Sequence, residues 1–146
     1  MSCRFVIPGP PQGKARARTV HNPHTGRVQS YTPDRTARYE ELVRLCYRRA
    51  RGAAETPTGL PVSVEILARF PVPCSASKTQ RRQMQSGILR PAKKPDADNI
   101  AKIVCDALNG VAYQDDKQIC SLTVVKKYED GVHPPGVYVI IREDPT

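Results

Sequence analysis

Aspartates are concentrated in residues 93–119, which read KKPDADNIAKIVCDALNGVAYQDDKQI. Asp96 and Asp98 are two residues apart, and Lys102 follows four residues after Asp98. A second pair, Asp115 and Asp116, lies further along in a polar stretch. Carboxylates that meet at neutral pH repel one another and raise one another's pKa, and a divalent cation relieves that repulsion. If the two pairs meet, the sequence predicts a metal site built from Asp96, Asp98, Asp115 and Asp116.

The donor types indicate which metal this site would take. Mg²⁺ prefers carboxylate oxygens and water to sulfur or imidazole, and this cluster of aspartates offers no Cys or His ligand. Mg²⁺ held by aspartates usually acts on phosphates, because it activates water and stabilises charge on the phosphate oxygens. Lys102 fits either as a cation near the charge of the transition state or as a group that orients the attacking water. We therefore expect Mg²⁺, with Mn²⁺ as a substitute.

A helix predicted over residues 99–108 must position these groups. Its apolar residues form one stripe, and Asp98 and Lys102 lie opposite that stripe on a shared face. We place Asp98 or Asn99 at the helix cap, with Asp96 and Asp98 in extended backbone, where a spacing of two points both side chains the same way. Asp115 and Asp116 precede a strand that begins near residue 119. A helix packed on that strand would bring the two aspartate pairs together.

Each aspartate motif also has a purely structural interpretation. DADN alone is a good helix cap, and QDDKQ alone is a good polar turn. Neither structural interpretation predicts the other motif. We therefore favour chemistry for the two motifs together with the lysine register.

The remaining elements predict an α+β domain that spans residues 1–146. Strands are expected at about 3–8, 61–72, 119–128 and 136–142, and a helix of about 16 residues from Asp34. Residues 12–32 form a basic arm or hairpin around His24-Thr25-Gly26. Residues 73–95 are a mobile basic segment that could hold a short helix, capped by Ser75 or Ser77 and ended by Gly87. We expect a small mixed sheet with two main helices on one face.

Charge is distributed unevenly along the chain. Residues 1–95 hold 18 basic and 5 acidic residues, a net charge of +13, whereas residues 96–146 hold 5 basic and 9 acidic residues, a net charge of −4. This pattern favours a surface that binds a polyanion around an acidic pocket. The expected phosphate contacts, which give affinity without reading base sequence, are Lys14, Arg16, Arg18, Arg81, Arg82, Arg90, Lys93 and Lys94.

Several classes of protein are excluded. No apolar run approaches the roughly 20 residues of a membrane span, and the N-terminus does not resemble a signal peptide. Five cysteines are an odd number and form no CxxC pair, which argues against a disulfide framework and a zinc ribbon. We expect a reducing, cytoplasmic compartment.

The run K-P-D-A-D-N-I-x-K-x-x-x-D-A-L-N-G, followed by Y-x-D-D-x-Q-I, resembles the RusA family of Holliday junction resolvases, common in phages and prophages. A weaker similarity covers IPGPPQGKARAR, YTP and a lysine at 126 or 127. The resemblance implies a homodimeric, Mg²⁺-dependent endonuclease that nicks branched DNA symmetrically, in a bacterial or phage-infected cell. It implies that Asp96, Asp98 and Asp116 are the essential acids and Lys102 the essential lysine. Asp115 would be a second ligand or a positioning residue, and we assign Asp106 to structure.

The leading hypothesis is therefore a structure-selective endodeoxyribonuclease that resolves four-way DNA junctions, serving recombination and repair. A two-fold dimer would place one site on each of two symmetric strands, with strand residues such as Val124 and Val137 at the interface. One alternative is a non-catalytic protein that binds branched DNA. Another is a metal-dependent phosphohydrolase of small nucleotides, which the basic content of residues 1–95 disfavours.

Overall fold

The computed structural model describes residues 2–16, 18–31, 33–52 and 56–144. Its main sheet has the strand order β1-β6-β4-β5. Strand β4 pairs in parallel with β5, whereas β6 pairs antiparallel with both β1 and β4, so the sheet is mixed as predicted. The strands are β1 (Ser2–Pro8), β4 (Val62–Phe70), β5 (Ile119–Tyr128) and β6 (Gly136–Glu143).

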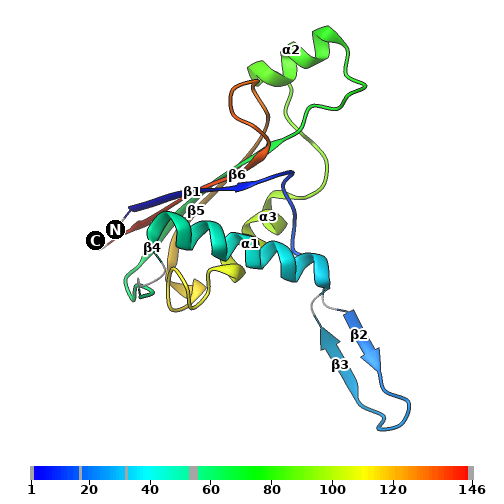
Figure 1. The fold of residues 1–146 in the computed structure, drawn as a ribbon, viewed down its shortest axis with the longest axis vertical. Coiled ribbons are helices and arrows are strands. Elements are labelled where there is room, and N and C mark those ends of the chain that lie inside the picture. Colours follow the sequence, from blue (N-terminus) through cyan, green and yellow to red (C-terminus); the bar gives the residue numbers. More distant parts are fainter. Residues whose placement is uncertain (1, 17, 32, 53–55, 145–146) are drawn as a thin grey trace.

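Two helices, α1 (Asp34–Arg51) and α3 (Ala97–Ala107), lie on the same side of this sheet (Figure 1). Helix α1 buries Tyr39, Val43 and Tyr47, and the ring of Tyr47 meets Phe5 of β1 edge-on at 5.7 Å. Helix α3 buries the predicted apolar stripe, which includes Ile100. The predicted α+β class, with two main helices on one face, is confirmed.

The sheet presents its other face without a covering helix among the described residues. Strand residues alternate between the two faces of the sheet. Val137 is fully buried in the core, and the partly buried Val124 packs against the core. The expectation that these two valines form a dimer interface is therefore wrong for Val137 and does not suit Val124. Leu67, Val125 and Ile140 lie on the open face instead, where they line a shallow groove.

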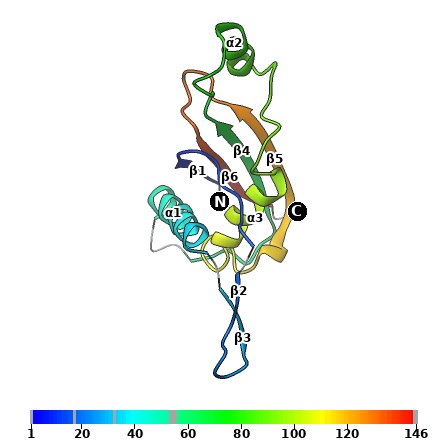
Figure 2. The ribbon, with the colours of Figure 1, turned by 90° about the vertical axis from the view of Figure 1, so that its right-hand side faces the viewer.

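Two projections extend from opposite ends of the molecule (Figures 1 and 2). One is the predicted hairpin, formed by β2 (Arg18–His21) and β3 (Val28–Tyr31). The other carries the short helix α2 (Lys78–Ser86), which Ser77 caps and Gly87 ends with a φ of +88°. The expected short helix in residues 73–95 is thus present, while the mobility of that segment stays a prediction.

Within the described residues, no helix is both long enough and apolar enough to cross a membrane. All five cysteines are free thiols. Cys3 and Cys105 are buried, Cys46 is half-buried, and Cys74 and Cys120 are exposed.

Candidate active site

Helix α3 brings an acid and a lysine to one surface. Asp98 lies in its first turn and Lys102 one turn later, and both are exposed on the side opposite the buried stripe. Both side chains line a cavity of about 460 Å³ between α3 and the start of β5. We call this the acidic cavity, and its lining consists of Asp98, Ala101, Lys102, Cys105, Asp106, Asp116, Ile119 and Leu122.

Asp116 enters this cavity from the 3₁₀ helix η1 (Asp116–Gln118), which leads into β5. Asp115 caps η1, because one carboxylate oxygen accepts a hydrogen bond from the Lys117 amide at 2.9 Å. The Gln118 side chain accepts from the Asp115 amide and donates to the carbonyls of Thr58 and Leu60. The acidic turn is therefore fixed to the loop that precedes the neighbouring parallel strand β4.

Negative charge accumulates at the Asp115–Asp116 pair. A hydrogen bond with Asp115 raises the pKa of Asp116 above its ordinary value, and the charges of Asp115 and Asp106 add to the effect. The Lys117 amide lowers the pKa of Asp115. Of the two acids, Asp116 thus holds a proton more readily and Asp115 loses its proton more readily.

The donors of the acidic cavity fit Mg²⁺ in kind. Asp98, Asp106 and Asp116 contribute carboxylates to one cavity, and a cation would offset the charge that raises the pKa of Asp116. Burial raises the pKa of the Cys105 thiol to about 11, so without a bound cation Cys105 is a protonated residue of the cavity wall. Among the described residues, no three His, Cys, Asp or Glu side chains form a group poised to hold a metal. The predicted four-aspartate ligand set stays a prediction.

Asp96 does not lie where the sequence analysis expected. The helix begins at Ala97, so Asp96 is its N-cap residue and Asp98 lies inside the first turn. Residues two apart in a helix differ by about 200° in direction, whereas extended backbone would have aligned them. Asp96 accordingly lines a different cavity from Asp98. Placing Asp98 or Asn99 at the cap, with Asp96 and Asp98 side by side, was wrong.

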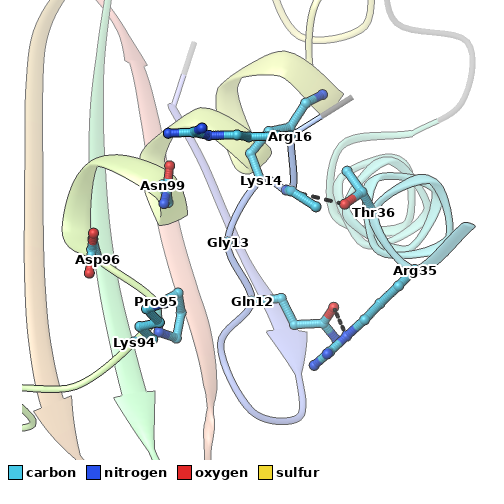
Figure 3. A pocket seen from close by; sticks show the side chains of 11 residues that line it. Gln12, Gly13, Lys14, Arg16, Arg35, Thr36, Lys94, Pro95, Asp96 and Asn99 are labelled. Atoms are coloured by element: carbon cyan, nitrogen blue, oxygen red, sulfur yellow. Dashed lines mark hydrogen bonds between the residues drawn. The ribbon is translucent and has the colours of Figure 1, made fainter. Parts of the chain in front are cut away.

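The cavity that Asp96 lines has a volume of about 550 Å³ and lies beside the N-terminus of α3 (Figure 3). We call it the basic pocket. Its lining comprises residues 12–16 together with Arg35, Thr36, Lys94, Pro95, Asp96 and Asn99. The sequence analysis expected Arg16 and Lys94 to contact DNA but missed Arg35. The position of Arg35 in the first turn of α1, directly after Pro33 and Asp34, was the only available signal.

Lys14 links the two cavities. Its ammonium group lies 3.1 Å from a carboxylate oxygen of Glu40 in α1 and 3.4 Å from one of Asp106 in α3. Asp106 also lines the acidic cavity, so the structural role that we assigned to it stays a prediction. A DNA contact by Lys14 stays a prediction, and the positive charge of Lys14 is already matched within the fold.

The other predicted DNA contacts lie in several elements. Arg81 and Arg82 are in α2, and Arg90 and Lys93 are exposed in the segment that leads from α2 to α3. Arg18 begins β2, and its side chain is outside the described part of the structure. Whether these residues contact DNA stays a prediction.

The resemblance to the RusA family includes a lysine at position 126 or 127. Lys126 contacts the segment that leads from α2 to α3. Its ammonium group donates to the carbonyl of Lys93 and lies 5.1 Å from the centre of the Phe70 ring. Lys127 lines the groove on the open face of the sheet. Lys126 therefore holds residues 93–95, and with them the start of α3, against the sheet.

Aspartates and a lysine in one cavity, beside a pocket of basic side chains, are the groups with which a metal-dependent nuclease could act on DNA. The family model described as endodeoxyribonuclease RusA matches residues 8–142 of the chain. The chain is also 36% identical, over 147 residues, to a Bacillus subtilis (strain 168) protein named uncharacterized protein YqaN, with 98% of each chain covered. The chain therefore belongs to the RusA endodeoxyribonuclease family.

Proposed function

We propose that this protein is a structure-selective endodeoxyribonuclease that resolves Holliday junctions by Mg²⁺-dependent hydrolysis of phosphodiester bonds. The observation that carries the proposal is the acidic cavity, which Asp98, Lys102 and Asp116 line together, in a member of the RusA family. The basic side chains of residues 12–16, α2 and residues 90–94 support a polyanionic substrate.

The side chains of the cavity suggest a division of roles. Asp98 and Asp116, which line the same cavity, would hold Mg²⁺, and the bound ion would supply an activated water and a counter-charge for the phosphate. Asp96 and Asp115 do not line this cavity, and their part in holding the ion belongs to the proposal. Lys102 is four residues from Asp98 on the same helix face, so its ammonium group can stabilise the negative charge that grows on the phosphate oxygens. Cys105 and Ala101 close the buried side of the cavity.

The central test is the variant Asp98→Asn. Removing this carboxylate should lower the rate of junction cleavage by at least about a hundredfold, since a metal ligand is lost. Junction binding should persist or tighten, because one negative charge is removed beside the DNA. Cleavage is measured on a labelled four-way junction with Mg²⁺, and binding by gel shift with EDTA.

The control for this test is Glu41→Gln, which removes an exposed carboxylate on the outer side of α1 and should leave cleavage unchanged. Cleavage by Asp98→Asn at the wild-type rate would contradict the assignment of the acidic cavity. Cleavage by the unmodified protein that persists in EDTA would contradict the metal requirement.

The same assays separate the two alternatives. A non-catalytic protein that binds branched DNA would shift the junction equally with EDTA and with Mg²⁺ and would cut it in neither. A phosphohydrolase of small nucleotides would hydrolyse nucleotides in Mg²⁺ without competition from long DNA.

We also propose that the protein acts as a homodimer. A four-way junction offers two symmetric strands, and a two-fold dimer presents one acidic cavity to each. The open sheet face supports this proposal, because Leu67, Val125 and Ile140 contribute apolar side chains to a groove that no described helix covers. Glu65 and Lys127 also line this groove. A second copy of the chain could bury that groove.

A further inference from the structure

The basic pocket has a fixed wall on the side of residues 12–16. The Lys14 amide donates to the Asn99 carbonyl at 3.1 Å, and the Ala15 amide donates to the Thr36 hydroxyl at 3.3 Å. Gly13 approaches α3 so closely that an added Cβ would lie 3.0 Å from the Cβ atoms of both Asn99 and Pro95. These contacts hold the segment between α1 and the start of α3.

Arg35 is held toward this wall from the other side. Its Nε donates to the Gln12 side-chain oxygen at 3.3 Å, and the two side chains meet at the edge of the pocket (Figure 3). A guanidinium that uses Nε in this way keeps its terminal nitrogens for a ligand. Arg35 is therefore pre-oriented before any ligand binds.

The charge of the pocket is positive and largely unmatched. Lys14 is neutralised by Glu40 and Asp106, as described above. Within the described residues, no ion pair with a carboxylate engages Arg16, Arg35 or Lys94. Among the described residues of the lining, Asp96 is the one that carries a carboxylate. The unpaired positive charges of Arg16, Arg35 and Lys94 outnumber the negative charge of Asp96, so the pocket attracts an anion.

The lining also indicates which part of DNA would enter. Among the described residues, the lining contains no aromatic side chain on which a base could stack. Its cationic groups are two guanidinium groups and two ammonium groups, of which that of Lys14 is already paired with carboxylates. Guanidinium groups match the paired oxygens of a phosphate. The ligand chemistry is therefore that of a backbone phosphate and not of a base.

We infer that the basic pocket binds one phosphodiester group of the cut strand, close to the phosphate at the acidic cavity, through Arg16, Arg35 and Lys94. The two cavities lie on either side of the first turn of α3, since Asp96 lines one and Asp98 the other. This inference rests on the proposed function. Arg35 becomes a positioning residue that sets which phosphate reaches the acidic cavity.

The inference is tested with four-way junctions that carry one uncharged methylphosphonate linkage, moved step by step along the cut strand. Binding is measured with EDTA, so no cleavage is needed. For the wild-type protein, a linkage at one position beside the cut should weaken binding at least roughly tenfold, because the charge that Arg16, Arg35 and Lys94 contact is lost. Arg35→Gln should bind every junction more weakly and should lose the sensitivity at that one position.

Arg16→Gln, in a different segment, should abolish the sensitivity at the same position, which guards against a folding defect in either variant. The matched control is Arg48→Gln, an exposed arginine at the far end of α1, which should keep the wild-type profile. Sensitivity that persists at the same position in both Arg16→Gln and Arg35→Gln, or a flat wild-type profile, would overturn the inference.

Cleavage of the unmodified junction in Mg²⁺ is measured in parallel. A protein that shows the expected binding profile but does not cut would contradict the nuclease proposal and support the pocket. A protein that cuts but lacks the profile would overturn the pocket alone.

Discussion

At the scale of single residues, Cys105 connects the candidate active site with the core. It lines the acidic cavity, yet only 7% of its surface is exposed. The Tyr113 hydroxyl donates to the Cys105 carbonyl at 2.6 Å, so this part of α3 is held by a buried hydrogen bond. Burial raises the pKa of the thiol from an ordinary value of 9.0 to about 11.

This raised pKa predicts a stability loss in alkali. The unfolded chain releases the Cys105 proton at lower pH than the folded chain does. The contribution to the free energy of unfolding is therefore complete below about pH 9 and is lost as the pH rises to about 11. The loss should reach roughly 2–3 kcal/mol at most. It is measured by urea unfolding of the wild type and of Cys105→Ala across this range.

Because Tyr113 is present in both proteins, the difference between their two pH profiles reports Cys105. Cys105→Ala should start less stable, since a buried side chain is lost, but should lose less stability between about pH 9 and about pH 11. Parallel profiles would show that the thiol does not ionise differently in the folded and unfolded chains.

The residue scale also shows what a sequence can predict about a site. Asp98 and Lys102 were placed together correctly because both lie on one helix, where a spacing of four sets a shared face. Arg35 was missed because its partner Gln12 is 23 residues away in the chain and belongs to an irregular segment. Such a contact depends on how α1 packs, which no local pattern encodes.

At the scale of elements, α2 is a helix that depends strongly on local interactions. None of its residues is fully buried, although Met84 packs against the core, and a capping box holds its first turn. The Ser77 hydroxyl accepts from the Gln80 amide at 3.1 Å, and the Gln80 side chain accepts from the Ser77 amide at 3.0 Å. The helix was predictable from residues 75–87, SASKTQRRQMQSG, which offer a serine to cap its start and Gly87 to end it.

Ser77→Ala should therefore destabilise α2 by about 1 kcal/mol without unfolding the sheet. Hydrogen exchange in residues 78–86 should become several-fold faster, while the midpoint of global unfolding changes little. Ser75→Ala, an exposed serine just before the cap, is the matched control and should change neither. Equal protection of α2 in both variants would contradict the role of the cap.

Element boundaries explain the main errors of prediction. The strand at Ile119–Tyr128 was predicted with the correct ends. The helix that carries Asp98 begins two residues earlier than expected, and this small shift sends Asp96 and Asp98 to different cavities. The sequence also could not tell which face of β6 meets the helices, because both faces are apolar, so Val137 was placed outside the core.

At the scale of the whole molecule, the open sheet face predicts the oligomeric state. Ile140→Lys should weaken self-association at least about tenfold, because it places a charge among the apolar side chains of the groove that a second copy would bury. Sedimentation measures the change. Paired cuts in a junction should give way to single nicks, since one protomer holds one acidic cavity.

The control for this variant is Leu45→Lys, a change to an exposed leucine on α1, which lies on the other side of the sheet. It should leave both self-association and paired cutting intact. A dimer of unchanged stability in Ile140→Lys would move the interface away from the open sheet face.

The segment that carries α2 is held to the sheet at both of its ends. The Phe70 carbonyl, at the end of β4, accepts a hydrogen bond from the Glu129 amide at 2.8 Å. The Lys126 ammonium group of β5 donates to the Lys93 carbonyl, just before α3. Residues 71–92, α2 included, lie between these two contacts. A change in the length of that segment should therefore leave the start of α3, and the aspartates there, in place.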